Sequence, residues 1–333
     1  MRHQFATGWR ASLIWLALGW IINISFPNSA NCQEPAAKGG YLNLPTRTMG
    51  GQQFWTDHRW WYGWRLQRNH FTGHWRLLDG RNIRRAWGSR EACLAEMAEQ
   101  QLATEAPAAP QAVVVLLHGL MRSSDSMEPL EAAFKARGDM LPIAFSYAST
   151  QASIDDHAAA LCEWVEHLPG RPKISFVGHS LGNIVVRRSL AMWQRNGDTG
   201  QVIARLHRIV MLGPPNQGSS IAKRLAKLGL FERITGSSGQ ELGAAWDELQ
   251  QRLATPPCPF CIIAGDLSES PVKNPLLGGQ SDFIVTLEET RLEGAAEYVT
   301  LPVLHSFLMS DRGAQAATLR FIEPPSAAAK PGN

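Results

Sequence analysis

Six short apolar runs recur along the last two thirds of the chain. They cover residues 112–117, 141–147, 173–177, 208–213, 260–266 and 297–304. A continuous apolar run of this length is too short for a helix and is typical of a strand buried on both faces. Segments with apolar residues at helical spacing lie between these runs. The alternation predicts a doubly wound, mostly parallel α/β sheet, in which ligands bind at the carboxyl ends of the strands.

Two of the intervening segments have clear helix signals. After Ser153 the apolar residues Ile154, Ala158, Leu161, Val165 and Leu168 recur at helical spacing. Asp156 stands at the reciprocal capping position, three residues after Ser153. An earlier segment places Met127, Leu130 and Phe134 on one side and ends before Gly138. Both patterns predict helices that pack one face against the sheet.

Residues 52–101 have a different pattern, rich in tryptophan and arginine. Six of the twelve tryptophans lie between Trp55 and Trp87. The pattern predicts two or three short antiparallel strands, then a helix capped by Ser89 that runs to about Gln101. Arginine with tryptophan is also a combination that binds nucleic acid or carbohydrate. We favour packing of arginine stems over indole rings, and we expect no nucleic-acid partner.

Residues 1–30 have the layout of an export signal. Arg2 and Arg10 make a basic start, an apolar run follows at 11–26, and no acidic residue occurs before Glu34. The alternative is an uncleaved membrane anchor through residues 11–26, although a spanning helix needs about 20 residues. We therefore predict an exported protein, periplasmic or extracellular, with membrane anchoring as the alternative.

Composition fits one large domain with additions at both ends. The chain has 333 residues, 44% of them hydrophobic, and its net charge of +3 is too small to imply a polyanionic partner. We predict a linker at 31–51, the main domain at 112–322 and a disordered tail at 323–333. Five cysteines leave at least one unpaired within the chain. Cys258 and Cys261 can form a disulfide or redox pair, but we place them at the start of a buried strand.

The run at 173–177 leads directly into Gly178-His179-Ser180-Leu181-Gly182. A Gly-x-Ser-x-Gly sequence between a strand and a helix is typical of a nucleophile elbow. The two glycines allow the sharp turn that holds the serine in a strained conformation. The helix that follows points its free N–H groups at the serine, where they stabilise negative charge. Ser180 is therefore the candidate nucleophile.

A serine hydroxyl needs a histidine base, which in turn is oriented by a carboxylate. His305 directly follows the last predicted strand and is the candidate base. Asp266 and Asp282 both precede it and give the order Ser, Asp, His. We prefer Asp282, because the glycines at 278 and 279 let its loop swing the carboxylate beneath His305. Asp266 remains the alternative acid, or it caps a turn.

An oxyanion hole needs two N–H donors. Leu181 supplies one from the elbow, and Leu120, or less favourably Met121, supplies the other from the loop after the first strand of the main domain. Further residues at or just beyond strand ends line the predicted site: His118, Met121, Tyr147, His179 and Pro214. The ten histidines have no metal-ligand spacing and no phosphate-binding glycine loop occurs, so we expect neither a metal nor a cofactor.

Together these motifs resemble the alpha/beta-hydrolase fold, specifically its bacterial lipase/esterase branch. The resemblance rests on His118-Gly119-Leu120, the Gly178–Gly182 elbow, Ser281-Asp282-Phe283-Ile284-Val285 and Leu304-His305. It covers about 112–322 and implies an ester hydrolase without an organic cofactor, with Ser180, Asp282 and His305 as the triad. It does not include residues 52–101.

The segment 216–257 is predicted as an insertion between two strands. It carries Ile221, Leu225, Leu228 and Phe231 among Lys223, Arg224, Lys227 and Arg233. A basic amphipathic helix of this kind is a lid that meets a lipid surface or a packed cap with a solvated face. The expected substrate is a small-molecule or lipid ester. Acyl transfer on the same triad and a non-catalytic binding protein remain alternative functions, and the oligomeric state is open.

Overall fold

The computed structural model describes residues 46–47, 52–226, 231–243, 245–271, 274, 277 and 279–322. The predicted export signal and the predicted tail lie outside these ranges. The described residues all belong to one compact unit, Tyr41–Asn333. Within them, no helix combines the length and the apolar composition that crossing a membrane requires.

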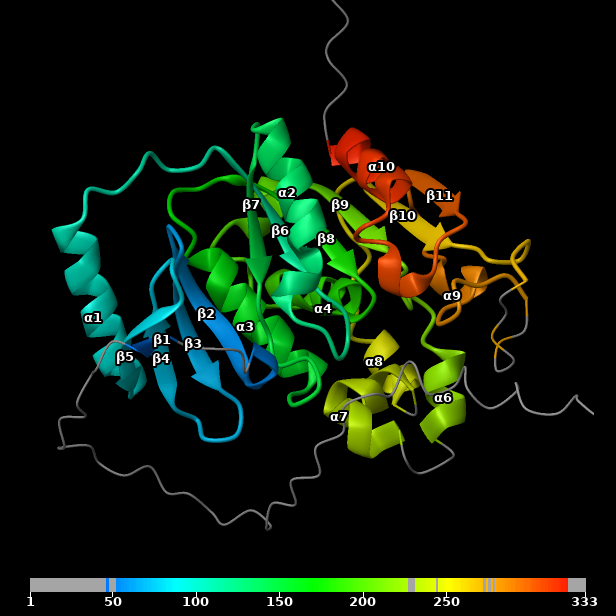
Figure 1. The fold of residues 1–333 in the computed structure, drawn as a ribbon, viewed down its shortest axis with the longest axis horizontal. Coiled ribbons are helices and arrows are strands. Elements are labelled where there is room, and N and C mark those ends of the chain that lie inside the picture. Colours follow the sequence, from blue (N-terminus) through cyan, green and yellow to red (C-terminus); the bar gives the residue numbers. More distant parts are fainter. Residues whose placement is uncertain are drawn as a thin grey trace, which may run out of the picture. The chain divides into compact units, whose positions relative to one another are not determined.

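Six parallel strands form the central sheet (Figure 1). Their order across the sheet is β11-β10-β9-β8-β6-β7, and every neighbouring pair is parallel. The strands are β6 (Ala112–Leu117), β7 (Leu141–Phe145), β8 (Lys173–His179), β9 (Leu206–Leu212), β10 (Phe260–Gly265) and β11 (Glu297–Leu301). The predicted doubly wound parallel sheet is confirmed. The direction of winding reverses between β6 and β8, which is where such sheets place their ligand sites.

Helices cover both faces of this sheet. They are α2 (Glu128–Arg137), α3 (Ile154–Glu166), α4 (Leu181–Arg195), α5 (Val202–Arg205), α9 (Leu287–Thr290) and α10 (Arg312–Ile322), with short 3₁₀ turns at η3 (Ser124–Met127) and η4 (His305–Phe307). The Ser153/Asp156 capping box opens α3, and Gly138 ends α2 with φ 79°. Both predicted helix signals are confirmed.

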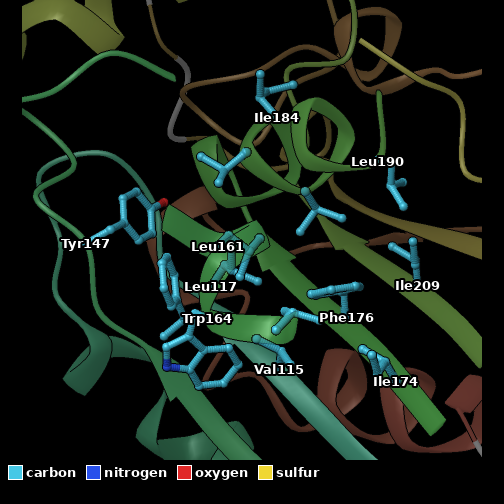
Figure 2. Close-up of a cluster of buried hydrophobic side chains, with 14 of the residues drawn as sticks. Val115, Leu117, Tyr147, Leu161, Trp164, Ile174, Phe176, Ile184, Leu190 and Ile209 are labelled. Atoms are coloured by element: carbon cyan, nitrogen blue, oxygen red, sulfur yellow. The ribbon is translucent and has the colours of Figure 1, made fainter. Parts of the chain in front are cut away.

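Alternate residues of β6 pack into two separate hydrophobic clusters, one on each face of the sheet. Val113, Val115 and Leu117 pack with side chains of α3 and α4, whereas Val114 and Leu116 pack with α2 and α10. Figure 2 shows the first core, where Leu117, Leu161, Trp164 and Phe176 come together with Tyr147 at one edge. The continuous apolar run is therefore explained by burial on both faces.

A second, antiparallel sheet precedes the main domain. It contains β1 (Thr46–Arg47), β2 (Trp55–Trp61), β3 (Trp64–Asn69), β4 (Trp75–Leu78) and β5 (Ile83–Gly88) in the order β1-β5-β4-β3-β2, with η2 (Gln52–Phe54) before β2 and α1 (Arg90–Ala103) after β5. Ser89 caps α1 by accepting the N–H of Ala92 at 3.2 Å. The sheet has more strands than the two or three predicted, and β1 lies within the range predicted as a linker.

The small sheet packs against α3, with β2 alongside this helix (Figure 1). The carboxylate of Glu163 in α3 forms ion pairs with Arg59 and Arg90, and its Oε2 lies 2.8 Å from His58 Nδ1. Trp60 belongs to the same buried cluster as the core of the main sheet. Arginine side chains also lie over indole rings, as in Arg76 over Trp55 at 3.9 Å. The contacts are those expected of packing.

In the described part of the insertion between β9 and β10, the chain forms three short helices. They are α6 (Ser220–Ala226), α7 (Phe231–Leu242, kinked at Gly236) and α8 (Trp246–Gln250). The side chains of Leu225, Leu228 and Phe231, on which the prediction of a lid or a packed cap rests, lie outside the described part of the chain. Trp246 is buried and its ring lies against Gly218.

Four of the five cysteines lie among the described residues. Cys93, Cys162, Cys258 and Cys261 are all free thiols, so the pair at 258 and 261 forms no disulfide. Cys261 is the second residue of β10 and is fully buried. Burial raises the pKa of its thiol to about 12, which keeps it protonated and unreactive.

Candidate active site

Ser180 stands at the junction of β8 and α4 in a conformation that few residues adopt. Its φ is 52° and its ψ is −119°, and its N–H donates to the carbonyl oxygen of Leu212 at 2.9 Å. A non-glycine residue with this backbone is held there by its surroundings. Leu181 begins α4, so its N–H has no partner within the helix. This is the geometry expected of a nucleophile elbow.

The two glycines of the elbow are required by space rather than by φ. A Cβ atom on Gly178 would lie 2.4 Å from Asn183 Oδ1, and one on Gly182 would lie 2.7 Å from the carbonyl oxygen of Leu117. Asn183 Nδ2 in turn donates to the carbonyl oxygens of Ser180 and Leu212. The turn is therefore packed too closely on both sides for any larger residue.

Asp282 and His305 are brought together although 23 residues separate them. His305 Nδ1 lies 2.7 Å from Asp282 Oδ2. The other carboxylate oxygen, Oδ1, accepts the N–H groups of Ile284 and Val285 at 3.0 and 2.7 Å. Asp282 is fully buried and His305 is 6% exposed. The carboxylate is thus rigidly held and fixes the imidazole in the tautomer with a proton on Nδ1.

Gly213, the residue after β9, connects this pair to the elbow. It has φ 51°, and a Cβ atom on it would lie 2.9 Å from His305 Nδ1. The imidazole therefore lies against the backbone directly after Leu212, whose carbonyl oxygen holds Ser180. His179 Nε2 also lies 3.0 Å from the carbonyl oxygen of His305. The Asp282–His305 pair and the elbow that carries Ser180 therefore lie on either side of the backbone at Leu212 and Gly213.

Asp266 is engaged elsewhere. Its carboxylate accepts the N–H and hydroxyl of Ser268 at 2.9 and 3.0 Å and the side-chain amide of Gln280 at 3.1 Å. These contacts are those of a turn cap, which was the second role predicted for Asp266. Among the two acids, Asp282 is the one in contact with His305.

The loop after β6 passes directly over the serine. A Cβ atom on Gly119 would lie 3.2 Å from the Cβ of Ser180 and 2.7 Å from His179 Nδ1. The N–H of Arg122 donates to the carbonyl oxygen of Gly119 at 3.3 Å and closes a tight turn, in which Met121 has φ 60°. Leu120, the predicted oxyanion donor, lies in the middle of this turn. We call residues 118–122 the oxyanion loop.

The remaining predicted lining residues are buried behind this loop. His118 stacks on Tyr147, with ring centroids 4.2 Å apart and an interplanar angle of 15°. Burial lowers the pKa of His118 to about 4, so its ring is neutral at neutral pH. Burial, together with the neighbouring charge of His305, also lowers the pKa of His179. Pro214 is buried directly after Gly213. These residues support the site from behind.

Two close approaches were missed from the sequence. One is Gly213 beneath the ring of His305. The other is Gly265 at the end of β10, where a Cβ atom would lie 2.5 Å from the Cβ of Asp282. The sequence did carry a signal for both close approaches. Each apolar strand run ends in a glycine, which is followed by a Pro-Pro turn at Gly213 and by a candidate acid at Gly265.

Similarity to a known protein family covers the part of the chain that contains Ser180. Residues 108–244 match the model of a family described as "Putative serine esterase (DUF676)". This range includes the oxyanion loop and Ser180 but ends before Asp282 and His305. No curated protein matches the sequence.

Two solved structures share the arrangement of strands and helices. The mature form of the lipase BlEst2 from Bacillus licheniformis is 18% identical with a TM-score of 0.51, over 66% of this chain and 95% of that one. Phospholipase PlaB from Legionella pneumophila is also 18% identical with a TM-score of 0.50, over 66% of this chain and 60% of that one. This protein has the alpha/beta-hydrolase fold. The family match supports ester hydrolysis as the class of reaction.

Among the described residues, no three histidine, cysteine, aspartate or glutamate side chains gather as metal ligands do.

Proposed function

We propose that this protein is a serine carboxylic-ester hydrolase that acts through an acyl-enzyme on Ser180. The observation that carries the proposal is the buried Asp282–His305 pair, held against Gly213 beside the elbow. His305 is the base, Asp282 is the acid that orients it, and the N–H groups of Leu120 and Leu181 are the oxyanion donors. Asp282, which the sequence analysis already preferred to Asp266, is the only acid in this proposal.

In the first half-reaction, Ser180 Oγ attacks the ester carbonyl carbon while His305 Nε2 removes the hydroxyl proton. The carbonyl oxygen becomes an anion, which the N–H groups of Leu120 and Leu181 stabilise. Asp282 stabilises the imidazolium that forms, because its Oδ2 already accepts Nδ1–H. Collapse of the intermediate breaks the bond to the alcohol, which leaves with the proton from His305.

In the second half-reaction, water replaces the alcohol. His305 removes a proton from the water, the hydroxide attacks the acyl carbon, and a second oxyanion forms in the same position. Its collapse releases the carboxylic acid and returns the proton to Ser180. An alcohol in place of water would make the reaction an acyl transfer, so access of water decides between the two outcomes.

The surroundings of the site favour an ester with an apolar part. Met121 follows Leu120 and is 49% exposed, and Phe307 follows His305 by two residues and is 58% exposed. Large apolar side chains that stay in solvent beside a reactive centre are typical of a surface that receives an apolar ligand. The substrate class we propose is a small-molecule or lipid ester, with contact to a lipid surface through this region.

The test is turnover of a series of p-nitrophenyl esters of increasing chain length. Wild-type protein should hydrolyse at least one ester and should be labelled by a fluorophosphonate, whereas Ser180→Ala should lose both properties. A preference for long chains would identify a lipase, and added alcohol would reveal acyl transfer as a second product. A folded wild-type protein that is inert and unlabelled would instead favour a non-catalytic binding protein.

Export is a separate proposal that rests on the pattern of residues 1–30. Expression of the full chain in a bacterial host, followed by fractionation and determination of the amino terminus, tests it. Recovery from the periplasm with residues near 30 removed would establish a cleaved signal. An intact amino terminus in the membrane fraction would establish an anchor through residues 11–26.

A further inference from the structure

The small antiparallel sheet is connected to the loop that follows β7. The N–H of Asp57 in β2 donates to the carbonyl oxygen of Ser146 at 2.9 Å, and the N–H of Ser146 donates to Asp57 Oδ2 at 3.0 Å. Two residues further on, the N–H of Ala148 donates to Thr56 Oγ1 at 3.1 Å. The residues on both sides of Tyr147 are thus fixed by β2.

Asp57 is itself held rigidly by the small sheet. It is fully buried, and its second oxygen, Oδ1, accepts the side-chain amide of Gln67 at 2.7 Å. Gln67 Oε1 accepts Arg76 Nε at 2.8 Å, and the Arg76 guanidinium lies over the Trp55 ring. The buried polar groups form a connected chain across β2, β3 and β4. A buried carboxylate with every contact satisfied is a fixed anchor.

Tyr147 carries this anchoring to the oxyanion loop. Its hydroxyl donates to the carbonyl oxygen of His118, and its ring stacks on the imidazole. Tyr147 is 1% exposed, so neither contact competes with bulk water. Since the pKa of His118 is lowered to about 4 by burial, the imidazole is neutral and carries one ring proton at neutral pH.

His118 in turn controls the peptide bond that contains the proposed oxyanion donor. His118 Nδ1 lies 2.9 Å from the carbonyl oxygen of Gly119, which it can bind only as an N–H donor. That oxygen and the N–H of Leu120 belong to one planar trans peptide group, in which they point in opposite directions. Because His118 and the N–H of Arg122 both hold this oxygen, the direction of the Leu120 N–H, the proposed oxyanion donor, is fixed as well.

We propose that the small sheet is a positioning element of the active site, acting from Asp57 and Thr56 through Tyr147 and His118 on the N–H of Leu120. The inference rests on the proposed function and adds a role for residues 52–101, which lie outside the family match. Tyr147, His118, Asp57 and Thr56 are positioning residues, because none of them contacts the reacting atoms.

Tyr147→Phe tests the proposal, since it removes the hydroxyl and keeps the stacked ring. The expected result is a fall in kcat of about tenfold to a hundredfold with KM within about twofold, because the donor matters most in the transition state. Tyr62→Phe is the matched control. It also removes a tyrosine hydroxyl bound to a backbone oxygen, that of Pro107 at 2.7 Å, and it should leave kcat unchanged.

A thionoester series separates positioning from loss of folded protein. Sulfur in place of the carbonyl oxygen accepts hydrogen bonds weakly, so a thionoester gains little from the oxyanion donors. The ratio of ester to thionoester turnover should fall in Tyr147→Phe by the same factor as kcat. A merely structural effect would lower both rates equally and leave the ratio unchanged.

Thr56→Val is the second variant, because it acts from the small sheet and preserves the shape of the side chain. It should lower the same ratio in the same direction. Unchanged kcat and an unchanged ratio in both variants would overturn the proposal, and so would equal loss of both rates. A wild-type protein that neither turns over esters nor reacts with the fluorophosphonate would instead overturn the proposed function.

Discussion

Asp282 holds His305 through both its side chain and its backbone. Asp282 Oδ2 lies 2.7 Å from the imidazole Nδ1, and its carbonyl oxygen accepts the N–H of His305 at 2.9 Å. The second contact fixes the position of the His305 backbone in the segment after β11, and the first fixes the orientation of its ring. Both loops, after β10 and after β11, are therefore joined at the point where the base is needed.

The first prediction concerns the two candidate acids. Asp282→Asn should lower kcat by about 10⁴-fold, the scale known for loss of the carboxylate from a Ser-His-Asp triad, because the amide no longer selects the Nδ1–H tautomer. Asp266→Asn is the matched control. It should retain kcat within about threefold, since the carboxylate of Asp266 binds Ser268 and Gln280 and not His305. Steady-state kinetics of both variants decide the assignment. The reverse order of effects would make Asp266 the acid.

The second prediction concerns the glycine beneath the imidazole. Gly213→Ala should reduce kcat by about a hundredfold or more, because its Cβ atom would lie 2.9 Å from His305 Nδ1 at a φ of 51°. Gly197→Ala is a useful comparison: it has a φ of 81° but nothing within 4 Å of its Cβ atom. Both variants should be less stable than wild type because of backbone strain, whereas only Gly213→Ala should have a reduced kcat. Equal kcat in the two would place the histidine elsewhere during turnover.

The third prediction concerns the oxyanion loop. Gly119→Ala should reduce the rate of fluorophosphonate labelling of Ser180 by about a hundredfold. The added methyl group would meet His179 Nδ1 at 2.7 Å and the Cβ of Ser180 at 3.2 Å, so the loop must move away from the serine. Circular dichroism and thermal melting should remain close to wild type, because the site is on a loop. Normal labelling would show that the loop is not part of the hole.

The fourth prediction concerns the contact between the small sheet and α3. Glu163→Gln should destabilise the protein by about 1–3 kcal/mol, since it removes the charge that accepts Arg59, Arg90 and His58 in a partly buried setting. Urea unfolding at pH 7 measures the effect. Glu99→Gln, on the outer turns of α1, is a surface control that should change stability by less than about 0.5 kcal/mol.

The same carboxylate should make stability depend on acid. Partial burial alone would raise the pKa of Glu163, but the hydrogen bond and charge of His58, the charge of Arg59 and the hydrogen bond from Arg90 outweigh it and lower this pKa to about 2. A lowered pKa in the folded state means that the contribution is complete above pH 4.5 and is lost as pH falls toward 2. The stability difference between wild type and Glu163→Gln should therefore shrink below pH 4.5. A constant difference down to pH 3 would contradict this assignment.

Much of the main domain followed from local pattern. Residues 112–117 had no polar position to mark an exposed face, and they form a strand with these same limits that is buried on both sides. The capping box at Ser153 and Asp156 involves only neighbours in sequence, so it was visible without any tertiary information. The elbow was visible for the same reason. Each of these features is decided by residues within a few positions of one another.

Features that depend on distant neighbours were not predicted. The register of β2 and β3 shifts between Asp57 and Arg59, and a bulge of this kind interrupts the two-residue period on which a sequence reading relies. Nothing near Asp57 in the chain indicates that Ser146 is its partner, 89 residues away. The role of Gly213 likewise becomes visible only when His305 is in place. The sequence alone kept Asp266 and Asp282 as alternatives because loop geometry is not encoded in periodicity.

The place of Trp60 has a consequence for where this protein can be divided. Its indole belongs to the same buried cluster as Val113, Phe145 and Trp164, although the family match begins only at residue 108. Removing residues 52–101 would open a tryptophan-sized hole beside the first strands of the main sheet. The family match therefore begins inside a core that both sheets share, and we expect the two sheets to unfold as one cooperative unit.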